Sequence, residues 1–376
     1  MPAQPSPDHA YHPPAGPERF ADVDRPTLVV DRSRAERNIA RMAAKAAASG
    51  VRFRPHFKTH NRVEVGEWFR AAGTSAITVS SVEHALRFAD AGWDDITIAF
   101  PLVTRALPSI RSLASRIRLG VLLDSPEAAA VLTGVEAPLD VWVDVDAGYG
   151  RSGAAWDDAA RLAAVGAELG RLPRHRLRGV LTHSGQTYHA PSRAAIEGIW
   201  AETASRLAAA RDVLSGATGR SGLEISVGDT PGCSVVPRFE GVDEVRPGNF
   251  VFYDLQQLAV GSCTEEEIAL AVACPIVGVY PERGEAVVHG GSVQLSRDTA
   301  PGPDGGQNLG RLAVVDAEGW RLLPAEAGFV RGVSQEHGVL RCSPDVLARL
   351  RVGDLAFIVP AHACLPANLI RDLLVV

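Results

Sequence analysis

The residues best suited to covalent chemistry surround a lysine early in the sequence. Lys58 lies in the segment RPHFKTH, with His56 two positions before it and His60 two positions after it. A lysine that is partly removed from water can lose its charge, and its neutral amine can then form a Schiff base with an aldehyde. The alternative is a solvated surface lysine, and the rest of the sequence must decide between the two.

A second segment has the composition of a phosphate-binding turn. SVGDTPGCS, from Ser226 to Ser234, places small and hydroxyl-bearing residues directly after an expected strand. Such turns expose backbone N–H groups that bind phosphate, here with help from the hydroxyl groups of Ser226 and Thr230. An ordinary Gly/Pro turn is the alternative, and Asp229 disfavours an anion unless its side chain points away.

Two potential metal ligands lie near the end of the sequence. His362 and Cys364 are separated by one residue in PAHACLPANL. Residues at i and i+2 of an extended segment point to the same side, so both can reach one ion. Imidazole with thiolate suits zinc. The alternative is a buried cysteine beside a hydrogen-bonded histidine.

Other polar residues have a structural interpretation at least as good as a catalytic one. Asp144 and Asp146 resemble a carboxylate pair for acid–base catalysis, yet alternating acidic residues at a strand end more often cap the following turn. His337 in QEHG either contacts a substrate or fixes a turn.

Eight strand-then-helix units are expected to position these residues. Short β-branched runs alternate with Ala-, Leu- and Arg-rich stretches of helical spacing from about residue 51. The expected strands are VRFRPHF, AITVSS, DDITIAF, RIRLGVLLD, LDVWVDVD, RLRGVLTH, LEISVG and DEVRPG. The clearest helices cover residues 60–72, 82–91, 156–169 and 194–214. This pattern predicts an α/β fold, a (β/α)8 barrel, with a doubly wound open sheet as the lesser alternative.

Active sites of such barrels form where the strands end, so polar residues at those positions test the prediction. The strand ends carry Lys58, Ser80, Asp146, Arg151, His183, Tyr188, Ser226, Gly228, Thr230 and Arg246. Polar side chains therefore gather where this fold would use them.

A β domain is expected to follow the barrel. After about Asp254, strand-like runs such as IALAVACPIVGVY, EAVVHGG, GRLAVVD, LLPAEAGFV and DLAFIVPA follow one another without long helices. The prediction is a barrel over residues 25–256 and a β domain over 257–376. PTLVVD, just before Arg32, is a candidate to pair with the later sheet. Residues 1–24 are expected to form a flexible tail, since six of the first 17 residues are proline.

Composition excludes several classes of protein. The chain has 376 residues, 46% of them hydrophobic and 22% charged, as in an ordinary globular protein. Its net charge of -6 disfavours nucleic acid as a partner. Five cysteines without a CxxC pair give no disulfide framework, which favours a reducing cytoplasm. No signal peptide and no membrane span are expected, because charged residues, Gly or Pro interrupt each apolar run.

Several motifs together resemble one family of enzymes. These are RPHFKTH, SVEHALRFADAGWDDITIAFPLV, GVLTHSGQTY, SVGDTP, EVRPGNFVFYD, EHGVL and PAHACLPANL. They look like the D-serine dehydratase and D-threonine aldolase family, whose members are pyridoxal phosphate enzymes of the alanine racemase type of fold. The resemblance runs in order from about Pro26 to about Leu369 and implies a barrel followed by a β domain.

The resemblance also implies roles for individual residues. Lys58 would hold pyridoxal phosphate as a Schiff base and take the α-proton of a D-amino acid, and His183 would join it as a catalytic residue. The implied cofactor-binding residues are Lys58, Arg151, His183, Tyr188, Ser226, Gly228 and Thr230. His362 and Cys364 would bind a divalent metal, with zinc preferred to manganese or magnesium. A homodimer is implied as well.

The implied activity is that of a lyase for D-β-hydroxy amino acids. Pyridoxal phosphate accepts electrons from the α-carbon, and the metal acts on the β-hydroxyl group as a Lewis acid. Elimination gives a 2-oxo acid and ammonia, whereas retro-aldol cleavage gives glycine and an aldehyde. We expect elimination, because the HAC motif and LTHSGQTY resemble the dehydratases and no second histidine follows Tyr188 and His189.

Two other functions compete with the lyase. A racemase would need a second base that the sequence does not reveal. A non-catalytic pyridoxal phosphate carrier is a different class of function, and the long β domain with its metal motif argues against it. Three departures from the family pattern leave the exact substrate open: Gln186 stands where the dehydratases have histidine, Gly232 where threonine is usual, and His289 where aspartate is usual.

Overall fold

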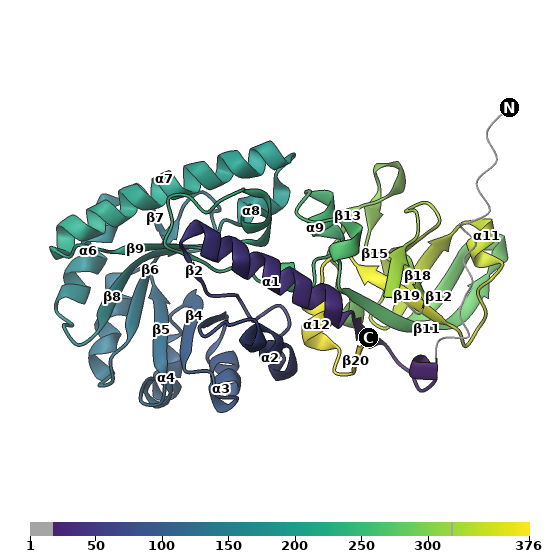
Figure 1. The fold of residues 1–376 in the computed structure, drawn as a ribbon, viewed down its shortest axis with the longest axis horizontal. Helices are drawn as coiled ribbons and strands as arrows, with labels where there is room; N and C mark the ends of the chain where they lie inside the picture. The colour runs from purple at the N-terminus through teal and green to yellow at the C-terminus, as the bar shows by residue number, and fades with distance from the viewer. Residues whose placement is uncertain (1–17, 317–318) are drawn as a thin grey trace. The chain divides into compact units, whose positions relative to one another are not determined.

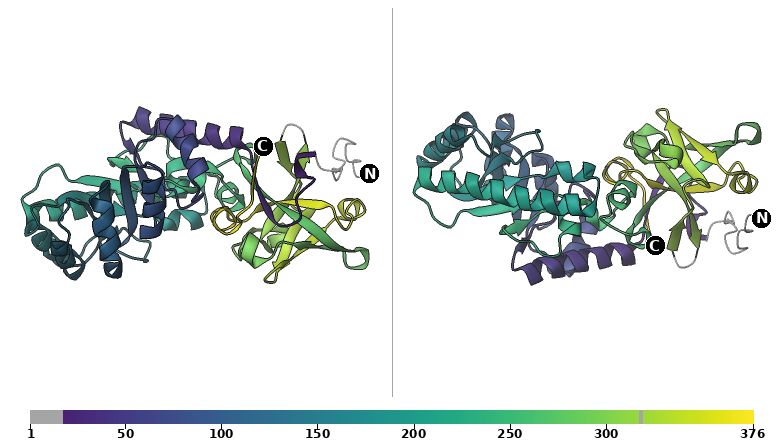
Figure 2. Two further views of the ribbon diagram at one scale, coloured as in Figure 1. Left: turned by 90° about the horizontal axis from the view of Figure 1, so that it is seen from below. Right: turned by 90° about the horizontal axis from the view of Figure 1, so that it is seen from above.

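The computed structural model describes residues 18–316 and 319–376, which divide into two compact units. The barrel unit consists of residues 36–251 and 260–262, and the β unit of residues 18–35, 252–259 and the described part of 263–376 (Figures 1 and 2). Most of the expected tail, residues 1–17, lies outside the described residues. Among the described residues, no helix has both the length and the apolar composition needed to cross a bilayer.

Eight parallel strands form the main sheet of the barrel unit, in the order β2-β10-β9-β8-β6-β5-β4-β3. They are β2 (Arg52–Phe53), β3 (Ile77–Val79), β4 (Asp95–Pro101), β5 (Arg118–Leu123), β6 (Asp140–Asp146), β8 (Arg176–Thr182), β9 (Glu224–Val227) and β10 (Glu244–Val245). The short β7 (Ala154–Ala155) pairs with β6. A parallel bridge between His56 and Thr78 joins the two ends of the order. The eight predicted strands and the barrel are confirmed.

Helices alternate with these strands along the chain (Figure 1). They are α1 (Arg32–Ser49), α2 (Val63–Ala71), α3 (Val82–Asp90), α4 (Leu107–Ala114), α5 (Pro126–Ala130), α6 (Ala159–Gly170), α7 (Arg193–Thr218) and α8 (Thr230–Val235). Local chemistry sets their ends. Asp158 accepts a hydrogen bond from the Arg161 N–H, so α6 begins at Ala159 rather than at Trp156. Gly219, at φ 64°, ends α7 in a left-handed conformation.

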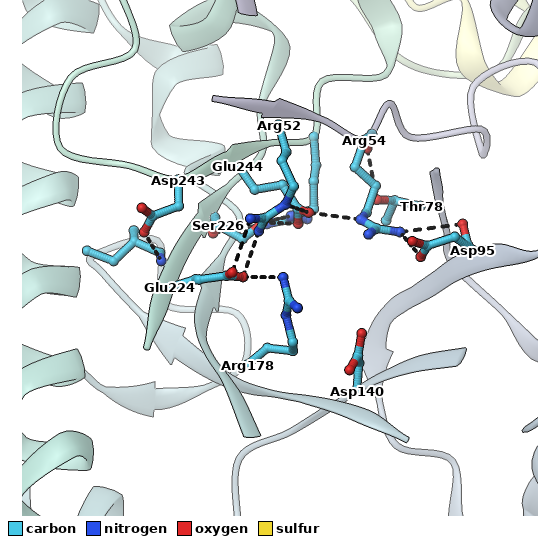
Figure 3. Close-up of polar contacts among 12 residues, drawn as sticks. Arg52, Arg54, Thr78, Asp95, Asp140, Arg178, Glu224, Ser226, Asp243 and Glu244 are labelled. Carbon is cyan, nitrogen blue, oxygen red and sulfur yellow. Dashed lines mark hydrogen bonds and ion pairs between the residues drawn. The ribbon is translucent and has the colours of Figure 1, made fainter. Parts of the chain in front are cut away.

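The interior of the barrel contains ion pairs of buried arginines where aliphatic layers are usual (Figure 3). The Arg54 Nε lies 2.9 Å from Glu244 Oε2, and its Nη1 lies 2.6 Å from Asp95 Oδ1. Beside them, Arg178 Nη2 lies 2.5 Å from Glu224 Oε2. The Glu244 side chain is fully buried. Burial of these charges is tolerable only because each has a partner at hydrogen-bonding distance.

The β unit is built on a nine-stranded sheet. Its strands are β1 (Thr27–Val30), β11 (Leu270–Tyr280), β12 (Glu285–His289), β15 (Gly310–Asp316), β16 (Gly319–Leu322), β17 (Gly328–Val333), β18 (His337–Cys342), β19 (Leu355–Pro360) and β20 (Leu373–Val375). β1, the predicted PTLVVD strand, pairs antiparallel with β11 and parallel with β20. The predicted pairing of this early segment with the later sheet is confirmed. A short hairpin of β13 (Ala300–Pro301) and β14 (Gln307–Asn308) and the helix α12 (Cys364–Leu369) complete the elements used below.

The buried pair of Arg54 and Glu244 gives a first prediction. Arg54→Met should lower the free energy of unfolding by about 3 kcal/mol, because it removes the nearest cation from a fully buried carboxylate. Urea denaturation measures the change. The control is Arg171→Met, which breaks an ion pair with Glu168 through an exposed arginine and should cost less than about 1 kcal/mol. Equal costs for the two variants would contradict the assignment.

Candidate active site

Lys58 lies in a turn directly after β2 that is fixed by its aromatic neighbours. The Phe57 ring, which is fully buried, lies 5.0 Å from the Phe69 ring and 5.1 Å from the Trp93 ring. His60 is also buried, and its ring lies 4.5 Å from that of Phe57. Lys58 itself is only partly buried. The turn is therefore anchored on both sides of the lysine, whose side chain begins at the C-terminal end of the barrel strands.

His183 follows β8 and is held as a neutral ring. Its Nδ1 lies 2.6 Å from the carbonyl oxygen of Gly228. Burial, together with the positive charges of Lys58 and Arg151, lowers the pKa of His183 to about 3. A neutral imidazole carries one hydrogen, and the carbonyl oxygen requires it on Nδ1. The Nε2 atom of His183 is therefore a hydrogen-bond acceptor at neutral pH.

The predicted phosphate turn contains two buried side-chain oxygen atoms without a hydrogen-bond partner among the described residues, Asp229 Oδ2 and Thr230 Oγ1. Thr230 is fully buried, and in the part of the chain that the structure describes its Oγ1 has no hydrogen-bond partner. Its backbone N–H donates to the Tyr188 hydroxyl oxygen at 3.4 Å. Asp229 turns back onto α8, where its carboxylate accepts hydrogen bonds from the Gly232 N–H and the Thr187 hydroxyl group. The Thr230 hydroxyl group is thus the donor that this turn can offer to a phosphate.

The N–H group of Gly228 is not available to a phosphate. Its N–H donates to the Thr182 carbonyl oxygen at 3.2 Å, and its own carbonyl oxygen binds His183. A side chain at Gly228 would approach the Arg246 carbonyl oxygen to 2.9 Å. The residue contributes close packing of two strand ends rather than a phosphate contact.

Ser226 makes its side-chain hydrogen bonds within the barrel. Its fully buried hydroxyl group donates to Glu244 Oε1 at 2.8 Å and accepts from Arg246 Nε at 2.7 Å. A serine hydroxyl group has a single hydrogen, and here Glu244 takes it. Ser226 therefore has no donor left for a cofactor phosphate. Its partner is Arg246. The sequence placed Arg246 among the polar residues at the strand ends but predicted no role for it.

The loop after β6 brings Arg151 toward the same residues. The Asp146 carboxylate accepts hydrogen bonds from the N–H groups of Gly148, Tyr149 and Gly150, so this residue caps a turn. The Tyr149 ring lies 5.7 Å from the His183 ring, and the Arg151 guanidinium lies 5.3 Å from the Tyr149 centroid. Asp146 therefore caps the turn after its strand, which is the structural alternative given by the sequence.

Asp144, also on β6, is buried and accepts a hydrogen bond from the Ser152 hydroxyl group at 2.9 Å. Burial raises the pKa of Asp144 to about 6. Its carboxyl group is thus partly protonated in mildly acidic solution, and the charges of Arg246 and Arg151 oppose that shift.

The structure gathers most of the predicted cofactor residues at one end of the barrel. Lys58, Arg151 and Arg246 all act electrostatically on His183. Tyr188 lies beside it, with 6.1 Å between the two rings. Gly228 and Thr230 follow on the next strand and helix. This end of the barrel therefore carries three cations and a neutral histidine, which suits an anionic ligand.

The predicted metal ligands lie in the β unit, after β19. His362 Nδ1 lies 2.6 Å from Asp298 Oδ2, and its ring also hydrogen-bonds Cys364. Burial lowers the pKa of His362, but the nearby Cys364, Asp298 and Asp254 raise it to about 11 overall. The expectation of an extended segment is wrong, because Ala363 has helical angles of φ -74° and ψ -28°. The two side chains meet nonetheless.

Asp298 was not identified from the sequence. It lies 64 positions before His362, in a stretch with no strand or helix signal, so only the folded structure reveals the contact. Within the described residues, no set of three or more His, Cys, Asp or Glu side chains is arranged to hold a metal ion.

Two of the departures from the family pattern have local explanations. A side chain at Gly232 would meet the Asp229 carboxylate at 2.7 Å, so glycine leaves room for that carboxylate. His289 lies opposite His337 in the pairing of β12 with β18, and its Nε2 is 3.7 Å from Glu336 Oε2. Gln186 has a buried Oε1 without a hydrogen-bond partner among the described residues.

Comparison with known proteins identifies relatives over nearly the whole chain. The family model for the alanine racemase N-terminal domain matches residues 30–256, and that for a putative serine dehydratase domain matches residues 269–376. D-threo-3-hydroxyaspartate dehydratase of Delftia sp. (strain HT23) is 36% identical over 91% of each chain. D-serine dehydratase of Dictyostelium discoideum is 29% identical over 93% of each chain. D-threonine aldolase of Arthrobacter sp is 28% identical over 98% of this chain and 93% of that protein.

Solved structures agree with the sequence comparisons. The structure of the Delftia dehydratase superimposes with a TM-score of 0.83 at 34% identity, over 93% of each chain. A cysteine-to-alanine mutant of that enzyme, described as the metal-free form, superimposes with a TM-score of 0.84 over 93% of each chain.

The neutral state of His183 gives a second prediction. Its folded pKa, about 3, lies below the ordinary value of 6.5, so between these two values the unfolded chain binds a proton that the folded chain does not. The free energy of unfolding should therefore fall as the pH decreases through this window. His183→Asn should reduce that pH dependence, whereas His189→Asn, at an exposed position, should not.

Nitrogen-15 NMR measures the same property directly. The His183 ring should remain neutral with its hydrogen on Nδ1 from pH 8 to pH 5. A titration midpoint near the ordinary value would show that the ring is not held as described.

Proposed function

The chain belongs to the family that joins an alanine racemase N-terminal domain to a serine dehydratase domain, and on that premise we propose a pyridoxal phosphate-dependent lyase acting on D-β-hydroxy amino acids. The observation that carries the proposal is the group of residues around Lys58. Three cations, a neutral histidine and a buried, unpartnered hydroxyl group meet at one end of the barrel.

These residues fit pyridoxal phosphate. The Thr230 hydroxyl group is a free donor for the phosphate, and Lys58 is the amine that would hold the aldehyde carbon and take the α-proton. When bound, the cofactor stabilises negative charge at the α-carbon of the amino acid. Arg151 and Arg246 supply positive charge, and Tyr188 binds the backbone N–H of Thr230 beside the phosphate position.

His183 would assist as an acceptor. Because its Nδ1 hydrogen is committed to Gly228, only Nε2 is available to a ligand, and that atom can accept but not donate. A neutral ring also avoids adding a fourth positive charge beside Lys58, which makes it easier for the lysine to act as a base.

A divalent metal on His362 and Cys364 is part of the proposal, with zinc as the preferred ion. Asp298 on the Nδ1 of His362 would fix the ring so that Nε2 faces the ion, the usual support for a zinc-bound histidine. With only two protein ligands, positions would remain for water or substrate. When bound, the metal supplies a Lewis acid for the β-hydroxyl group. The relative whose cysteine mutant is described as metal-free supports this assignment.

We favour elimination over retro-aldol cleavage as the outcome. Among the named relatives, the 36% identical protein and the 29% identical protein are dehydratases, and the aldolase is 28% identical. Retro-aldol cleavage is the second candidate because it needs the same cofactor and metal. A homodimer and a cytoplasmic location complete the proposal. In the described chain no cysteine forms a disulfide, which is consistent with a reducing compartment.

The products test the activity. Purified protein given D-serine, D-threonine or D-threo-3-hydroxyaspartate should release a 2-oxo acid and ammonia in equal amounts, with little glycine. Borohydride reduction should attach the cofactor to the peptide that contains Lys58. Lys58→Ala should reduce turnover by about a thousandfold or more, because it removes the base. Glycine and acetaldehyde formed from D-threonine faster than 2-oxobutanoate would identify an aldolase instead, with His189 as the first candidate base.

The metal site gives a further prediction. Asp298→Asn should weaken zinc binding about 10- to 100-fold, because the ring of His362 loses its orienting partner. Cys364→Ala should abolish binding and turnover. Both variants should keep nearly the melting temperature of the parent protein.

The control for the metal prediction is Asp345→Asn, at an exposed position of the same unit, which should bind zinc normally. Chelator competition measures the affinities. If removal of the metal unfolds the protein, the site is structural rather than catalytic.

A further inference from the structure

A buried chain of polar contacts connects the barrel interior to the group of cations around His183. Glu244 receives Arg54 on Oε2 and the Ser226 hydroxyl group on Oε1, at 2.9 and 2.8 Å. Ser226 in turn accepts from Arg246 Nε at 2.7 Å. Figure 3 shows Ser226, Glu244 and Arg54 in this network. Glu244 and Ser226 are fully buried and Arg246 is 3% exposed, so water does not compete for these contacts.

Strand register explains why these residues meet. Ser226 on β9 lies opposite Glu244 on β10, and Glu244 lies opposite Arg52 on β2. Directly opposed residues of neighbouring parallel strands point to the same face of the sheet. The contact is therefore built into the pairing of the strands and does not depend on a flexible loop.

Arg246 is held through two of its three side-chain nitrogen atoms. Its Nε binds Ser226 Oγ, and its Nη2 donates to the Thr182 carbonyl oxygen at 2.5 Å. In the described chain, no hydrogen bond of this guanidinium uses Nη1. That nitrogen lies next to Gly228, at 3.1 Å from where a side chain would begin. The Nη1 group is thus left for a ligand, close to the residue that binds His183.

We propose that Ser226 and Glu244 are positioning residues that hold Arg246 with its Nη1 group toward the bound cofactor, and that neither contacts the cofactor. The inference rests on the proposed function. It replaces the phosphate contact that the sequence predicts for Ser226. Glu244 supplies the negative charge and accepts the hydroxyl hydrogen of Ser226. The Ser226 oxygen is thereby oriented toward the guanidinium group of Arg246.

A double-mutant cycle tests whether Ser226 acts through Arg246. Pyridoxal phosphate is added to cofactor-free protein, and its dissociation constant is measured for the parent, Ser226→Ala, Arg246→Met and the double variant. Ser226→Ala should weaken binding about tenfold. In the Arg246→Met background the same change should have an effect of less than about twofold, because the residue it serves is gone.

Thr230→Ala is the matched control. Its hydroxyl group is expected to contact the phosphate directly, so its effect should be the same in both backgrounds. Circular dichroism and the melting temperature establish that each variant is folded. Where Arg246→Met does not fold, Arg246→Lys, which keeps the charge but lacks Nε, replaces it in the cycle with the same expectation.

The outcomes separate this inference from the proposed function. A parent protein that does not bind pyridoxal phosphate overturns the proposed function. If the parent binds it, two results overturn the inference about Ser226. One is an equal effect of Ser226→Ala in both backgrounds, which means direct contact. The other is no effect of Ser226→Ala in the parent, which means that Arg246 needs no positioning.

Discussion

The carboxylate of Glu244 is the constraint on which the barrel depends. A charge held inside a protein is costly unless ion pairs and hydrogen bonds replace its water. Arg54 and Ser226 do this for Glu244 at 2.9 and 2.8 Å, and neighbouring positive charges lower the pKa of its carboxyl group although burial alone would raise it. Through Arg54 the carboxylate stabilises the barrel. Through Ser226 it is also connected to Arg246, at the end of the barrel that carries Lys58 and His183.

The C-terminal end of the barrel instead gathers positive charges. Burial lowers the pKa of His183 most, and the positive charges of Lys58, Arg151 and Arg246 lower it too. Such a site attracts a phosphate and the carboxylate of an amino acid. It also keeps the histidine neutral, so that one ring nitrogen binds Gly228 and the other remains an acceptor.

Local sequence patterns predicted the framework, and contacts between distant residues determined the rest. The eight barrel strands were predictable because they are short runs rich in β-branched residues, most of them followed by a helical stretch. β18 and β20 were missed because His337–Cys342 is interrupted by glycine and arginine, and Leu373–Val375 has only three residues. Lys58, His183 and Thr230 were placed correctly at strand ends. The contact of Ser226 with Glu244 was not predictable because the two residues lie 18 positions apart, and Asp298 was missed because it lies 64 positions from His362.

In the proposed function, Thr230 rather than Ser226 contacts the phosphate, while Ser226 stays within the buried network. A crystal structure of the protein with pyridoxal phosphate bound tests this most directly. We expect the Thr230 hydroxyl group within hydrogen-bonding distance of a phosphate oxygen, and Ser226 Oγ still bound to Glu244 and Arg246. A Ser226 hydroxyl group turned away from Glu244 and bound to the phosphate would contradict it.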